Sequence, residues 1–169
     1  MPKAGVLRRA YYELIGYAGA LRRFRDASAE AFQFLRSDFG FGPLVFEETG
    51  YGALVRFENA TTVVEVHLDW REELILPYVR PGRDSPDHSA IAPPGVLLDA
   101  IMIHRGERPE KQIGVSKPEA MQKTIREYAR ALRTHAPEAL RGNFRGLALI
   151  RAARPEARWR ILGPDRPGK

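Results

Sequence analysis

The chain has 169 residues, 44% of them hydrophobic, which is the size and composition of one ordinary folded domain with its own core. It contains no cysteine, which excludes disulfides, thiolate zinc sites and cysteine nucleophiles. The net charge of +6 comes from an acidic middle, residues 38–78, between basic flanks, which fits either attraction within the fold or a basic surface for an acidic partner.

Helices are predicted over residues about 5–37. Apolar residues recur there at spacings of three and four, from Leu7 to Leu21, which puts them on one helical face. Asp26 and Ser28 are residue types that begin helices, so we expect a second helix to start there.

No segment has the apolar core of a signal peptide, and no apolar run approaches the roughly 20 residues that span a bilayer. We therefore expect a bacterial-type cytoplasmic protein with no membrane segment.

A sheet is predicted over residues about 43–80, where apolar and polar side chains alternate with a period of two. Turns at Thr49-Gly50, at Asn59-Ala60 and over residues 70–72 would pair Phe46 with Ala53, Val55 with Val64, and Leu68 with Leu74. All three turns put apolar residues on the same face. Pro77 has no N–H and suits an edge strand. The pattern predicts a four-stranded antiparallel meander with strand order 1-2-3-4.

A polar loop follows over residues 81–94, and helices return over about 95–153. Ser116-Lys117-Pro118-Glu119 has the pattern of a helix start with proline in the first turn. Residues 163–169 are expected to form a frayed tail. The whole chain, residues 1–169, is thus predicted to be a single α+β domain whose sheet is packed by N-terminal and C-terminal helices.

Two groups of residues could carry catalysis or bind a metal. Glu65, His67 and Asp69 occupy alternate positions of one strand and point the same way, as a general base or a metal ligand would require. Asp87-His88 lies in the long loop beside Ser85 and Ser89. The competing interpretations are a solvated strand face and a flexible linker. No GxGxxG, Walker, HExxH or GxSxG motif is present, so we expect no cofactor and no metal site.

A basic stripe on the C-terminal helices suggests a nucleic-acid-binding surface. Its members are Lys123, Arg126, Arg130, Arg133, Arg141 and Arg145. Positive side chains in such an array can contact phosphates. Glu119 and Glu127 interrupt the array, and the competing interpretation is a solvated helix face.

The face of the sheet opposite the predicted core also carries aliphatic residues. They are Val45, Leu54, Val63, Ile75 and Val79. Such a face is either covered by the chain's own helices or contacts a partner, which a second copy could supply in a homodimer. Our leading hypothesis is a non-catalytic protein-binding domain, as an adaptor, inhibitor or immunity-like factor would be. Nucleic-acid binding is the second hypothesis, and an enzyme using His67 and Asp87-His88 is the third.

Overall fold

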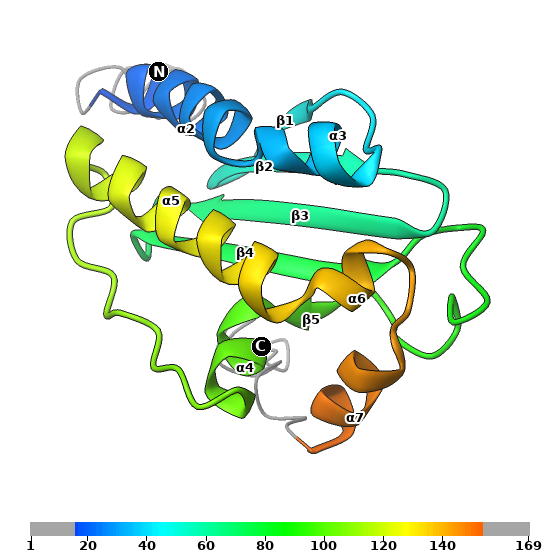
Figure 1. The fold of residues 1–169 in the computed structure, drawn as a ribbon. Coiled ribbons are helices and arrows are strands. Elements are labelled where there is room, and N and C mark those ends of the chain that lie inside the picture. Colours follow the sequence, from blue (N-terminus) through cyan, green and yellow to red (C-terminus); the bar gives the residue numbers. More distant parts are fainter. Residues whose placement is uncertain (1–15, 154–169) are drawn as a thin grey trace, which may run out of the picture.

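The computed structural model describes residues 16–153, and Figure 1 shows an antiparallel sheet with helices packed against it. In chain order the elements are α2 (Tyr17–Ala31), α3 (Gln33–Phe39), β1 (Val45–Thr49), β2 (Gly52–Glu58), β3 (Thr62–Asp69), β4 (Leu74–Pro81), β5 (Val96–Leu97), α4 (Leu98–His104), α5 (Pro118–His135), α6 (Pro137–Leu140) and α7 (Arg145–Ala153). The predicted α+β class is confirmed. The predicted helix around Leu7 and the tail 163–169 lie outside the described residues.

The sheet has five antiparallel strands in the order β1-β2-β3-β4-β5. Strands β1 to β4 form the predicted meander, which is therefore confirmed. The prediction lacked β5, a strand of two residues that pairs only with Tyr78 and Val79 of β4. Pro77 lies just beyond this short pairing, where a residue without an N–H interrupts no ladder.

The register of the first two hairpins differs from the prediction by two residues. Val55 pairs with Val66, not with Val64, because the turn is centred one residue later than expected. Asn59 holds that turn, since its Oδ1 accepts the N–H groups of Thr61 at 3.0 Å and Thr62 at 2.8 Å. A shift of two residues leaves every side chain on its predicted face.

The register between β3 and β4 differs by one residue, and this error exchanges the two faces of β4. Leu68 pairs with Ile75, not with Leu74, because the connecting loop contains one residue more than predicted. The extra residue is Glu73, which adopts a left-handed conformation with φ of 53°. Ile75 and Val79 therefore belong to the core, and placing them on the opposite face was wrong. Leu76, which a pairing of Leu68 with Leu74 would place in the core, lies on the opposite face instead.

The core lies between the sheet and the helices. Helices α2, α3, α5 and α6 cover the same face of the sheet in Figure 1. The spacing of Met121, Ile125, Tyr128 and Leu132 by four, three and four residues predicts one apolar face for α5, and all four residues are buried. These side chains join Val66 and its neighbours in one apolar cluster. The predicted helix start at Asp26 and Ser28 is wrong, because α2 continues to Ala31.

Candidate functional site

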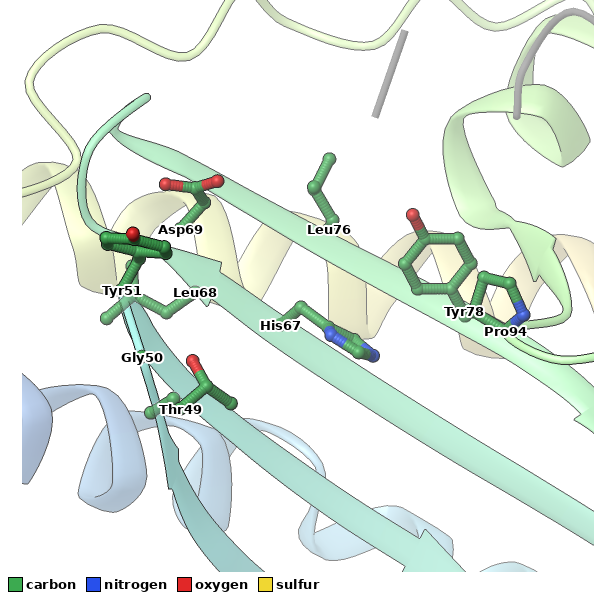
Figure 2. Close-up of a pocket in the computed structure, with 10 residues that line it drawn as sticks. Thr49, Gly50, Tyr51, His67, Leu68, Asp69, Leu76, Tyr78 and Pro94 are labelled. Atoms are coloured by element: carbon green, nitrogen blue, oxygen red, sulfur yellow. The ribbon is translucent and has the colours of Figure 1, made fainter. Parts of the chain in front are cut away.

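The side of the sheet turned away from α2 and α5 is called the second face here, and Figure 2 views it with those helices behind the strands. Two of the aliphatic residues predicted for it, Leu54 and Val63, are present but buried, with 7% and 4% exposed. Leu76 and Tyr78, brought there by the β4 register, are buried as well. Val45 is 40% exposed. The second face is thus mostly buried, and the apolar exposure that remains lies at the β1 edge.

Glu65 is the buried charged group of this face, with 9% of its side chain exposed. Arg56 Nε donates to its Oε1 at 2.9 Å, Arg80 Nη2 donates to the same oxygen at 3.2 Å, and His67 Nε2 lies 3.3 Å from Oε2. Burial alone would raise the pKa of the carboxyl. The hydrogen bonds from His67 and Arg56, and the charge of Arg80, outweigh burial and lower the pKa of Glu65 to about 2. Glu65 is therefore an ionised anchor between two arginines at neutral pH.

The strand residues predicted as a base or metal site contact other side chains of the sheet or the backbone of the next turn. The His67 ring meets the Tyr78 ring edge-on, with centroids 5.2 Å apart. Asp69 Oδ1 accepts two N–H groups of the following turn, at 2.9 and 3.1 Å. Glu65, His67 and Asp69 share one face as predicted. Only Glu65 and His67 are joined by a hydrogen bond, so the three do not form one constellation.

The loop of residues 84–89 is tied to the backbone of neighbouring elements. Asp87 Oδ2 accepts the N–H of Phe144, just before α7, at 3.3 Å. His88 Nδ1 lies 3.0 Å from the carbonyl oxygen of Gly82. Ser85 Oγ accepts the N–H of Asp87 at 3.2 Å. These contacts give the acid and the imidazole structural roles.

The two predicted catalytic neighbourhoods are far apart. His88 contacts Gly82, which follows the end of β4 that pairs with Thr62. His67 lies five residues further along β3, which corresponds to roughly 16 Å of strand. A metal ion bridging both imidazoles would need ligand atoms only about 2 Å from it. Within residues 16–153, no group of three or more histidines and carboxylates could hold a metal ion.

A cavity of about 270 Å³ opens on the second face beside the β1–β2 turn (Figure 2). Its lining residues include Thr49, Gly50, Tyr51, His67, Asp69, Leu76, Tyr78 and Pro94. Burial raises the pKa of Tyr78, so its hydroxyl remains a neutral hydrogen-bond donor. Apolar side chains and rings make up much of the wall, with a few polar groups, as in many sites for small molecules or single side chains. Sequence reasoning missed Tyr51 and Tyr78, because the turn and β4 were misregistered.

The β1 edge borders this region and is open to solvent. Strand β1 is exposed along its length except at Phe46, which is half-buried. Tyr51, in the turn that follows β1, is 48% exposed. Two carboxylates, Glu47 and Glu48, lie on opposite sides of the strand. The β1–β2 hairpin therefore combines exposed apolar groups with negative charge.

The basic stripe on α5 is engaged by carboxylates of other elements. Lys123 pairs with Glu110 at 2.8 Å, Arg126 with Glu30 at 3.2 Å, Arg130 with Glu107 at 2.7 Å, and Arg133 with Asp38 at 2.7 Å. Arg141 stacks over the Phe39 ring at 5.4 Å. Arg145, at the start of α7, is exposed. The excess of positive charge on α5 is thus largely balanced within the fold.

Comparison with known proteins returns no matching family model, no similar curated protein and no similar solved structure. Among the helices of residues 16–153, none combines the length and the apolar character needed to cross a bilayer.

Proposed function

We propose that the chain is a non-catalytic protein-binding domain, of the adaptor, inhibitor or immunity-like kind, whose contact region is the β1–β2 hairpin and the adjoining cavity. The observation that carries the proposal is the exposure of two large apolar side chains on one hairpin, Val45 at 40% and Tyr51 at 48%. The other exposed large hydrophobic residues of the described chain, Ile103, Ile113 and Leu149, come from three separate segments. Val45 begins β1 and Tyr51 follows its other end, so the two exposed side chains span the hairpin, and exposed apolar surface is a common mark of an interaction site.

The cavity supports the same region. It borders the Gly50-Tyr51 turn and has room for one apolar side chain of a partner. An exposed ring beside a pocket resembles the anchors that contribute most to binding at protein interfaces. The proposal includes action in the cytoplasm, which the absence of cysteine supports.

The two other hypotheses have less support. An enzyme built on His67 and Asp87-His88 would need groups that lie at different ends of the sheet. A nucleic acid bound along α5 would have to displace the carboxylates that pair with Lys123, Arg126, Arg130 and Arg133. Breaking these exposed ion pairs costs little free energy, because such pairs are weak. The net gain from each new phosphate contact would still be reduced by the carboxylate contact that it replaces.

A peptide-display screen tests the proposal. Immobilised protein is used to select from a random library, and the enriched peptides are synthesised and titrated by fluorescence anisotropy. We expect Val45→Ser and Tyr51→Ser each to weaken binding about tenfold or more, as for residues at the centre of an interface. Ile113→Ser is the matched control, since Ile113 is 74% exposed on another segment, and it should leave affinity unchanged. Failure to enrich peptides, or equal effects of all three variants, would contradict the proposal.

A further inference from the structure

The hydrogen-bonding direction of β1 follows from one contact on the next strand. Trp70 donates its backbone N–H to the carbonyl of Tyr51 at 2.8 Å. The backbone N–H and C=O groups of the odd-numbered residues along β2 therefore point toward β3. Backbone groups alternate sides along an antiparallel strand, so the even-numbered residues of β2 face β1. Their partners on β1 have odd numbers. The N–H and C=O groups of Phe46 and Glu48 therefore point outward, away from the sheet.

The opposite edge of the sheet offers little backbone for an added strand, because its edge strand β5 has only two residues. Strand β5 pairs with Tyr78 and Val79. Further along β4, the Gln112 side chain takes the place of a strand. Its Oε1 accepts the N–H of Ile75 at 2.6 Å and its Nε2 donates to the carbonyl of Ile75 at 2.8 Å. Of the two edges of the described sheet, β1 is the one that offers a row of outward backbone groups.

Edge strands in monomeric proteins are commonly blocked by proline, lysine, bulges or extreme shortness. Strand β1 has the sequence VFEET, pairs with β2 over all five residues without a bulge, and contains neither proline nor lysine. The five-residue strand is about 17 Å long, the length of an ordinary short strand, and its outward groups on Phe46 and Glu48 lie about 7 Å apart. The edge is therefore suited to accept an added strand.

The charges at the β1 edge indicate which kind of strand could be added there. Glu47 and Glu48 project to the two sides of the sheet at this edge, and Glu58 lies exposed at the far end of β2. Arg56 lies 3.5 Å from Glu47, while Glu48 has no ion pair within residues 16–153. A strand paired with β1 places its side chains about 5 Å from these carboxylates, where opposite charges attract and like charges repel. A second copy of β1 would bring its own Glu47 and Glu48 next to them, which disfavours a homodimer at this edge.

We infer that the partner supplies an extended segment carrying lysine or arginine, which adds to β1 as a sixth strand. The inference rests on the proposed protein-binding function and specifies its chemistry. Backbone hydrogen bonds to Phe46 and Glu48 hold the segment, and its basic side chains pair with Glu47 and Glu48. Neighbouring apolar side chains of the segment lie beside Val45.

The test uses the tightest-binding synthetic peptide from the display screen and two N-methylated forms of it. One form is methylated at odd and the other at even backbone nitrogens, so side chains and charge remain the same. Strand addition uses the N–H groups of one edge only, so one form should bind about tenfold more weakly or worse, and the other within about twofold. On the protein, Glu48→Pro removes an outward N–H and should cause a similar loss. Glu48→Ala, the control, should lose only the charge contribution, about twofold to fivefold.

The outcomes separate the two proposals. If the peptides bind and depend on Val45 but both methylated forms bind alike, protein binding stands and strand addition is wrong. If Glu48→Pro is misfolded by circular dichroism, the methylated peptides alone decide. Enriched peptides without lysine or arginine would overturn the basic character of the partner. Sedimentation velocity of the free protein should show a monomer across concentration, and dimerisation abolished by Glu48→Pro would assign the edge to a second copy instead.

Discussion

Replacing Glu65 with glutamine should destabilise the protein in a pH-dependent way. The folded protein holds the pKa of Glu65 at about 2, against an ordinary value of 4.5. A carboxyl whose pKa is lower in the folded than in the unfolded state stabilises the fold. This stabilisation is complete at a pH above the unfolded-state pKa and is lost as the pH falls through the folded-state pKa. The difference of about 2.5 pKa units corresponds to about 3 kcal/mol at pH 7. At pH 3 roughly 1 kcal/mol of it should remain, by the same linkage relation.

Urea denaturation followed by circular dichroism measures this effect. The free energy of unfolding of Glu65→Gln should fall about 3 kcal/mol below that of the unchanged protein at pH 7, and the two should converge toward pH 2. Glu47→Gln is the matched control, since Glu47 contacts the same Arg56 at 3.5 Å but is 51% exposed. An exposed pair contributes at most about 1 kcal/mol. If Glu65→Gln lowers the free energy of unfolding equally at pH 7 and pH 2.5, the loss comes from altered packing and not from the ionisation of Glu65.

Three further changes test the fold. Val66→Ala, in the middle of the core, should cost about 1–3 kcal/mol in urea denaturation, and a cost near zero would contradict the register of β3. Gln112→Ala leaves the N–H and C=O of Ile75 without their side-chain partner and should cost about 1–3 kcal/mol, with faster amide exchange at Ile75 by NMR. Asp87→Ala removes the acceptor for the Phe144 N–H and should cost about 0.5–1 kcal/mol; no loss of stability would return the loop of residues 84–89 to the list of functional candidates.

Local periodicity was sufficient to predict strands β1 to β4 and helix α5. The alternation in β2 and β3 and the spacing of Met121, Ile125 and Tyr128 on α5 each place apolar side chains on the core side of a regular backbone. That geometry repeats every two or 3.6 residues, so it is written into neighbouring positions of the chain. The order of the meander follows as well, because short turns force consecutive strands to pair.

The face of β4 depended on one loop residue. Glu73 in a left-handed conformation lengthens the β3–β4 loop by a single residue. No residue type in the loop announces this, since glutamate rarely adopts positive φ. Because strand side chains alternate, the single extra residue moved Ile75 and Val79 into the core and Leu76 and Tyr78 to the second face. The candidate site changed with them.

What the sequence determined by itself was the α+β class, the four-strand meander and the inner faces of β2, β3 and α5. Only the tertiary structure decided which charges are engaged, because ion pairs such as Arg126 with Glu30 and Arg133 with Asp38 join residues more than ninety positions apart. It also decided which edge is open, since Gln112 reaches Ile75 across 37 positions and occupies the edge of β4. Such contacts depend on where distant segments meet in space, and spacing along the chain carries no record of that.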